Sequence, residues 1–197
     1  MKRASVPIRL LVTSAILDIP TFLAGARVRL RPLTAADVDG PYLEWFNDAE
    51  VCRHNAHHVY PYTRDEALTW VAALRGRRDA LVLAIELDGR HVGNVSLQGI
   101  DPVGRSAELA IVLGDRDVWG QGIGLEAAEL LVGHGFSALN LRRIACGTVA
   151  ANAGMRRLAE RLGMTQEGVR REAVWSDGAY HDIVEYGLLA AEWEERA

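Results

Sequence analysis

Three glycines on alternate positions, Gly120, Gly122 and Gly124, stand just before an apolar, helix-favouring segment in the stretch WGQGIGLEAAELL. Glycine at this density is costly inside a helix, so these residues are expected to form a loop that leads into one. The first turn of a helix carries unpaired N–H groups and the positive end of the helix dipole. Because the glycines lack Cβ atoms, the backbone can approach a phosphate closely. The stretch therefore predicts anion binding.

Three kinds of phosphate site compete for this stretch. A nucleoside triphosphate P-loop needs a lysine after the glycines, and none follows here. The segment 122–127 satisfies the dinucleotide pattern G-x-G-x-x-A, but that pattern expects an acidic residue about 20 positions later. The next predicted strand, RIACGTVA, has none, so a nicotinamide-dependent oxidoreductase is only a remote alternative. The third kind of site binds the pyrophosphate of coenzyme A.

Other chemically active side chains give weaker signals. His54, His57 and His58 lie within five positions, but no carboxylate or cysteine completes a recognised metal-ligand pattern with them. A solvated loop is therefore favoured, and no metal site is predicted. Cys52 and Cys146 lie far apart and form no CxxC pair. This favours two buried thiols and a reducing, cytoplasmic setting.

The composition is that of one globular domain. The chain has 197 residues, of which 49% are hydrophobic and 24% charged, and this length can bury a sizeable core. A net charge of −4 offers no broad basic surface for nucleic acid. The basic start and short apolar run of residues 1–20 are interrupted by Pro7 and Arg9, which argues against a secretion signal or a membrane span. We expect an N-terminal extension over 1–20, mobile or ordered, and one domain over 21–197.

The order of the predicted elements indicates a mixed α/β fold. Period-two alternation marks strands, and capping residues at Thr34, Thr63 and Asn152 mark helix starts. Asp88-Gly89 and Ser176-Asp177-Gly178 are turn signals between strands, and Gly163 is expected to end a helix. The predicted order is a strand over 27–33, helices over 34–47 and 63–74, two strands within 80–97, a strand over 107–113, a helix to about 139, a strand over 143–150, a helix over 152–162, and strands over 168–175 and 180–189.

Beyond its physics, the glycine stretch resembles motif A of the GNAT acyltransferases, [QR]-x-x-G-x-[GA] after a strand. Trp119 stands where that consensus has Gln or Arg, and the fuller pattern W-G-[KQ]-G-[YI]-G-x-E-A is similar to the RimJ/RimL-type branch. The resemblance runs from about Phe22 to Trp193 and includes, in family order, VRLRPL, EWFND, AELAIVL, Asn152 with RLAERLGM, and WSDGAYHDIVEYGLL. It implies the GNAT fold, a central twisted mixed sheet of about seven strands with about four helices.

The resemblance also implies an acetyl-CoA site. In such enzymes the strand before the glycines splays from its neighbour, and its free backbone groups pair with the pantetheine arm; the matching residues are Val112, Leu113 and Gly114. Asn152 matches a pantetheine-contacting Asn, although a helix N-cap explains it equally well. Arg157 is an expected phosphate contact, in competition with Arg156 and Arg161. The backbone N–H groups expected to hold the pyrophosphate are those of Gly120, Gln121, Gly122, Ile123, Gly124 and Leu125.

The implied reaction is direct attack of a neutral primary amine on the acetyl thioester in a ternary complex, without a metal. Many relatives have a Tyr as the acid where this chain has Ala159, and a Ser where it has Met155, so the acid is unassigned. Glu108 is the expected base, acting through a water, with a strand-end ion pair as the alternative reading. Tyr180 and His181 are second choices.

The acceptor is the least defined part of the resemblance. The segment between the first two helices borders the acceptor site in this fold, so Trp45, His54, Asn55 and Tyr60 are expected to contribute. The acceptor is a small amine (amino sugar, polyamine, amino acid or antibiotic), which is slightly favoured, or a protein N-terminus. Because the usual Tyr is missing, a non-catalytic module that binds CoA or acetyl-CoA is the second class of function. Neither nucleic acid nor membrane is expected as a partner, and homodimers are frequent in the family.

Overall fold

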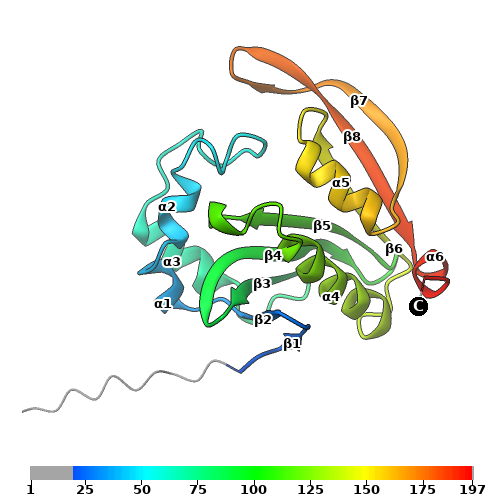
Figure 1. The fold of residues 1–197 in the computed structure, drawn as a ribbon, viewed down its shortest axis with the longest axis horizontal. Helices are drawn as coiled ribbons and strands as arrows, with labels where there is room; N and C mark the ends of the chain where they lie inside the picture. The colour runs from blue at the N-terminus through cyan, green and yellow to red at the C-terminus, as the bar shows by residue number, and fades with distance from the viewer. Residues whose placement is uncertain (1–19, 197) are drawn as a thin grey trace, which may run out of the picture.

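One mixed sheet of eight strands organises the computed structural model, which describes residues 20–196 (Figure 1). Nearly all of the predicted N-terminal extension lies outside the described residues. The strand order is β1-β2-β3-β4-β5-β6-β8-β7. The strands are β1 (Leu23–Ala24), β2 (Val28–Pro32), β3 (Ala80–Leu87), β4 (Arg90–Asp101), β5 (Ser106–Leu113), β6 (Arg143–Val149), β7 (Thr165–Ser176) and β8 (Ala179–Leu189).

Helices cover both faces of this sheet. Their bounds are α1 (Ala35–Val38), α2 (Tyr42–Phe46), α3 (Arg64–Ala73), α4 (Ile123–Ser137), α5 (Ala153–Arg161) and α6 (Ala190–Glu194), with a 3₁₀ turn, η1, at Arg116–Val118. The three-layer arrangement and its central mixed sheet confirm the predicted fold class. None of the helices within residues 20–196 is long and apolar enough to cross a membrane.

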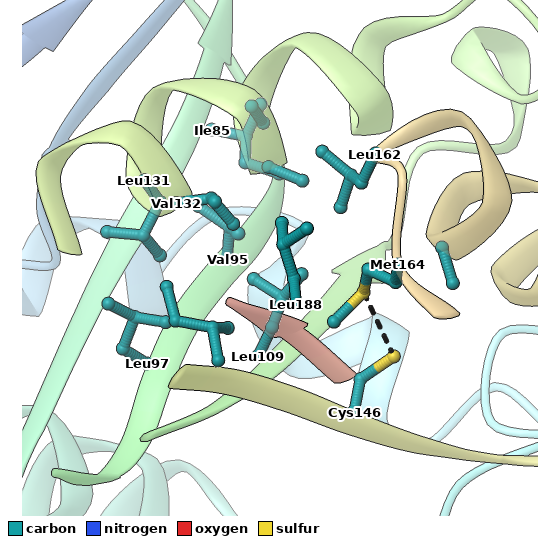
Figure 2. Close-up of a cluster of buried hydrophobic side chains, with 14 of the residues drawn as sticks. Ile85, Val95, Leu97, Leu109, Leu131, Val132, Cys146, Leu162, Met164 and Leu188 are labelled. Carbon is teal, nitrogen blue, oxygen red and sulfur yellow. Dashed lines mark hydrogen bonds between the residues drawn. The ribbon is translucent and has the colours of Figure 1, made fainter. Parts of the chain in front are cut away.

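The larger core lies between α4 and the sheet. Leu131 and Val132 of α4 pack against Val95, Leu97 and Leu109 of β4 and β5, and all five are buried (Figure 2). The buried Cys146 thiol lies 3.6 Å from the Met164 sulfur, the contact that the dashed line in Figure 2 marks, so this cysteine is a core residue as predicted. The opposite face carries a second cluster under α1–α3, formed by Leu33, Val38, Tyr42, Trp45, Phe46, Ala67, Val71 and Ala84.

Turn chemistry sets the hairpins that the sequence predicts. Asp88 and Gly89 both have positive φ, 50° and 74°, and join β3 to β4; Asp177 and Gly178 do the same, at 50° and 78°, between β7 and β8. Two successive residues of positive φ form the turn whose twist matches that of an antiparallel pair. Gly163, with φ 78°, follows α5 in the left-handed conformation expected of a terminating glycine.

The predicted helix over 34–47 is wrong in one respect, because the structure contains two short helices there, α1 and α2. Gly40-Pro41 separates them: proline has no N–H to donate, and the residue before it is biased away from the helical conformation. Two further elements, β1 and α6, were not expected. Both are short and owe their place to tertiary contacts; the Trp193 ring of α6, for example, lies 6.2 Å from that of Phe136.

Candidate active site

The sheet opens between β5 and β6. These neighbours are parallel and pair only over Ser106–Glu108 with Arg143–Ala145. Beyond this point β5 continues against β4 as far as Leu113, while β6 continues against β8 as far as Val149 (Figure 1). Within residues 20–196, the second half of β5 therefore has no strand partner on the β6 side and presents a backbone edge there. Unpaired N–H and C=O groups of this kind are a template for an extended ligand.

The glycine loop ends at the same place, where β5 leads through η1 to the start of α4. Gly120 and Gly122 have φ of 74° and 81°, a conformation that L side chains rarely adopt, and Gly122 is the N-cap of α4. Gly124 has a different role: a Cβ on it would lie 3.2 Å from Leu113 and 3.3 Å from Ile111. Its absence lets α4 pack closely on β5. The first N–H groups of α4 have no intrahelical acceptor and are free to meet an anion.

A cavity of about 370 Å³ lies beside this helix start, lined by Arg27, Gly120, Gln121, Gly122, Leu125, Glu126, Glu129 and Arg161. Arg27 is placed there by contacts that fix both its ends. Its Nη2 donates to the Gln121 carbonyl at 3.1 Å and its Nε to Glu126 at 3.2 Å. Glu126 Oε1 also accepts the backbone N–H groups of Arg27 and Val28, at 2.7 and 3.0 Å. Burial alone would raise the pKa of Glu126, but these donors outweigh it and hold the pKa below its ordinary value.

The predicted cofactor residues at the end of β5 differ in whether their backbone N–H and C=O groups point to β4 or to the unpaired edge. The Gly114 N–H donates to the Val92 carbonyl of β4 at 3.0 Å. Because these groups alternate along a strand, those of Val112 also face β4, whereas those of Leu113 and Ile111 face the unpaired edge. Of the predicted trio, only Leu113 therefore offers its backbone to this edge, and Ile111 was missed. Gly114 is instead a packing glycine, since a Cβ on it would lie 1.8 Å from the Trp45 ring.

The residues predicted on and beside α5 differ in whether they can reach a ligand. Asn152 is the N-cap of α5, and its side chain accepts the Met155 N–H at 3.1 Å. The capping role is therefore present, and the contact of Asn152 with the pantetheine arm stays a prediction. Arg157 is exposed and does not line the cavity, whereas its competitor Arg161 does. Arg156 contacts the Tyr186 hydroxyl and the Ala150 carbonyl. Arg157 and Arg161 are four positions apart on one face of α5, so helical periodicity alone could not separate them.

Glu108 lies where the two strands part, on the sheet face opposite α4. It pairs with Ala145, which pairs with Gly187 on β8. Two residues further along β6, or about 7 Å, Gly147 pairs with Glu185 on the same face. The pKa of the buried Cys146 thiol is raised to about 12, chiefly by burial and further by the negative charges of Glu108 and Glu185. Both carboxylates thus flank the opening, and Glu185 was missed by the sequence reasoning.

The second-choice catalytic residues lie further out. Tyr180 is seven residues from Gly187 along β8, about 23 Å, and is 63% exposed against Trp175 at the hairpin tip. The structure therefore does not bring Tyr180 next to Glu108. His181 shares the sheet face of Glu185 by alternation, and its Nε2 lies 3.1 Å from the Ser176 carbonyl.

The predicted acceptor residues fall into three environments. Trp45 is buried, 5% exposed, within the α1–α3 cluster. The Asn55 side-chain oxygen Oδ1 accepts the backbone N–H of His57 within its own loop at 2.9 Å, and Tyr60 is 83% exposed. Of the three loop residues His54, Asn55 and Tyr60, His54 lies within electrostatic reach of the β7–β8 hairpin.

Charged residues of two different segments influence the pKa of His54. The pKa of His54 is lowered, chiefly by burial and next by the charge of Arg53. Two residues of the β7–β8 hairpin also act on it: Asp177 raises the pKa and His181 lowers it. The loop between α2 and α3 and the β7–β8 turn therefore lie within electrostatic reach of each other. Among residues 20–196, no three His, Cys, Asp or Glu side chains converge as metal ligands.

The splayed strand, the glycine loop and the helix start agree with the sequence match that now decides the family. The model of the acetyltransferase (GNAT) domain matches residues 27–165. The chain belongs to the GNAT acetyltransferase family. This confirms the predicted family and the predicted enzyme class, an N-acetyltransferase.

Relatives of known name extend this result. YdaF of Bacillus subtilis, named as a ribosomal N-acetyltransferase, is 36% identical over 107 residues, a little more than half of each protein: 54% of this chain and 58% of YdaF. Spermidine N(1)-acetyltransferase of Escherichia coli is 27% identical over 161 residues, which cover 80% of this chain and 83% of that enzyme. The names of these two relatives thus refer to targets as different as spermidine and the ribosome.

Two solved structures share the fold. Spermidine N-acetyltransferase from Vibrio cholerae, in complex with CoA and spermine, has a TM-score of 0.78 at 22% identity and covers 86% of this chain and 99% of its own. RimL, the ribosomal L7/L12 alpha-N-protein acetyltransferase, in complex with CoA, has a TM-score of 0.77 at 23% identity, with 87% and 97% covered. At these identities the likeness concerns the fold.

Proposed function

We propose that this chain transfers the acetyl group of acetyl-CoA to a primary amine by direct attack in a ternary complex. The observation that carries the proposal is the meeting of two features at one place. The unpaired edge of β5 ends beside the glycine loop and the N-terminus of α4. An extended amide chain fits the first feature and a phosphate fits the second, and coenzyme A joins these two chemistries in one molecule.

The phosphate end rests on the N-terminus of α4. The N–H groups of Ile123, Gly124 and Leu125 face the pyrophosphate, with Arg27 and Arg161 beside them. Arg27 suits this role because Glu126 and the Gln121 carbonyl hold its guanidinium at the cavity while half of the side chain stays exposed. When bound, acetyl-CoA supplies an acetyl carbonyl activated as a thioester. The Leu113 and Ile111 N–H groups are the donors available to its arm and to charge that develops on the carbonyl oxygen.

The amine end approaches from the sheet face of Glu108. An ammonium must lose its proton before its nitrogen can attack, which costs little for an α-amine of pKa roughly 7.7–8 and more for an alkyl amine near 10.4. Glu108 takes this proton through a water and attracts the cationic amine. Glu185 pairs with Arg170 through Oε1 at 2.5 Å and offers its other oxygen, Oε2, on the side of Gly147. Ala145 and Gly147 leave room between the two carboxylates, since neither has a long side chain. The cysteines in the described part of the chain are free and buried, in keeping with the proposed cytoplasmic setting.

The acceptor is a cationic amine, either a small molecule such as a polyamine or a protein N-terminus. Relatives named for spermidine and for ribosomal N-acetylation support both kinds. The test follows thiol release from acetyl-CoA with a panel of spermidine, amino sugars, amino acids and peptides with free N-termini, and identifies the product by mass spectrometry. We expect amine-dependent release with at least one class.

A matched pair of variants locates the acceptor. Glu185→Gln is expected to raise the KM for the amine about tenfold, the worth of one charged hydrogen bond, without changing the KM for acetyl-CoA. Glu194→Gln, an exposed carboxylate on α6, is the control and is expected to change neither. CoA binding without release under every acceptor would refute the transferase proposal and favour a non-catalytic CoA-binding module.

A further inference from the structure

Trp119 makes one hydrogen bond that joins the two halves of the site. The residue is 40% exposed, yet its indole N–H donates to the Leu113 carbonyl at 2.9 Å. Leu113 is the last residue of β5, and Trp119 directly precedes Gly120, the first glycine of the loop. The bond therefore connects the end of the unpaired strand edge with the start of the glycine loop.

The acceptor of this bond lies on the unpaired edge. The Gly114 N–H faces β4, where it bonds to Val92, so the neighbouring Leu113 carbonyl faces the side from which β6 has departed. A carbonyl on this edge would otherwise be free to accept an amide N–H of an extended ligand. With the indole bound to it, the carbonyl of Leu113 is taken, and the carbonyl of Ile111 is the next one on the same side of the strand.

The loop between these two residues is anchored at Gly114, Asp115 and Val118. The N–H groups of Gly114 and Asp115 both reach the Val92 carbonyl, at 3.0 and 3.1 Å. Asp115 accepts from the Asp117 N–H at 3.0 Å and from Arg90 at 3.1 Å, and Val118 is buried in the main core. The Trp119 bond closes this anchored loop and so fixes the distance between strand edge and glycine loop.

We propose that Trp119 is a positioning residue that holds the glycine loop at a fixed distance from the edge of β5, so that both ends of one acetyl-CoA molecule bind at once. The inference rests on the proposed function. A ligand that spans two subsites gains affinity through the effective concentration of its second end, and this gain falls when the distance between the subsites varies. A fragment that fills only one subsite gains nothing from a fixed distance.

The test separates intact CoA from its parts. Trp119→Phe keeps an aromatic ring and removes the N–H donor; Trp70→Phe, on α3 and 39% exposed, is the matched control. Calorimetry measures the affinity of each protein for CoA, for pantetheine, and for adenosine 3′,5′-diphosphate. We expect Trp119→Phe to bind CoA about fivefold more weakly, the net worth of one neutral hydrogen bond. Both fragments should bind with less than twofold change, and Trp70→Phe should match the wild type throughout.

Three results would overturn the inference. Unchanged CoA affinity in Trp119→Phe, even with a lower melting temperature, would mean that the indole hydrogen bond only stabilises the fold and does not position the CoA site. An equal loss for pantetheine would mean that Trp119 contacts that arm directly, and an equal loss for the diphosphate would mean that it shapes the phosphate site. A wild-type chain that binds no CoA would instead refute the proposed function.

Discussion

Gly114→Ala is expected to be among the most destabilising single changes in this protein. A Cβ at this position would lie 1.8 Å from Cδ2 of Trp45 and within 2.3 Å of two further ring atoms. To reach an ordinary contact near 3.4 Å the indole must move by about 1.6 Å. Trp45 is only 5% exposed and packs between Tyr42 and His91, with ring centroids 6.4 and 4.9 Å away, so little free space exists for this movement.

Overpacking of a well-filled core costs about 1–3 kcal/mol. We expect a value at the upper end, about 3 kcal/mol, because three ring atoms overlap with one rigid position on the backbone. For a chain of this size this corresponds to a fall in melting temperature of about 6–12 °C. Urea denaturation measures the free energy of unfolding, and an unchanged m-value would show that the same structure unfolds.

The double variant Trp45→Ala, Gly114→Ala tests the cause. Trp45→Ala alone should cost about 3–5 kcal/mol through the cavity it leaves. With the ring gone, the new methyl group has room, so the double variant should be less destabilised than the sum of the single changes by at least 1–2 kcal/mol, roughly the coupling typical of contacting residues. A cost below about 0.5 kcal/mol for Gly114→Ala, or strict additivity, would refute the assigned contact.

Three further predictions concern charge. Asp37→Asn should destabilise by about 3–5 kcal/mol in urea denaturation, because it leaves the buried Arg31 without its bidentate partner; a change under 1 kcal/mol would contradict this. Burial raises the pKa of Asp37, but the hydrogen bonds and charges of His91 and Arg31 outweigh burial and hold the pKa well below its usual range. The stabilisation by the Asp37 carboxylate is therefore present above the unfolded pKa near 3.9 and should be lost as the pH falls below that value. Asp37→Asn should lack this acid-dependent loss of stability. Glu108→Gln should lower kcat about 10²-fold and flatten the acid limb of the pH–rate profile, and an unchanged profile would exclude Glu108 as the base. Arg27→Ala should raise the KM for acetyl-CoA about tenfold with kcat kept, the worth of one charged contact, and an equal KM would place the phosphates elsewhere.

Local signals in the sequence were enough to predict most of the fold. Alternation, capping residues and the two turns of positive φ are properties of a few neighbouring residues, and each long helix and each strand except β1 was placed within a few positions. The departures occur where distant residues decide. Gly40-Pro41 divides one predicted helix, and α6 is held by the contact of Trp193 with Phe136, which no local pattern contains.

The candidate site was predictable in its backbone and less so in its side chains. The glycine loop follows from conformation, and the place of the opening in the sheet followed from the family resemblance. Which residues of β5 turn their backbone groups to the opening depends on a hydrogen bond to Val92 of another strand, so the sequence alone could not show that Ile111 faces it and that Val112 and Gly114 face β4. Glu185 was missed because only the pairing of β6 with β8 brings it near Glu108. Trp45 was expected at the acceptor, but its ring is buried against His91 of β4 and the Gly114 backbone, contacts that no local pattern contains.

Backbone amide exchange measured by NMR, with and without CoA, tests most directly the central claim that acetyl-CoA lies along the unpaired edge of β5 with its pyrophosphate on the start of α4. We predict that added CoA slows exchange at Ile111, Leu113 and the first residues of α4. The N–H groups of Val112 and Gly114, already bonded to β4, should exchange at the same rate in both states. Equal protection along 111–114, or none at either the edge or the helix start, would contradict the proposed binding mode.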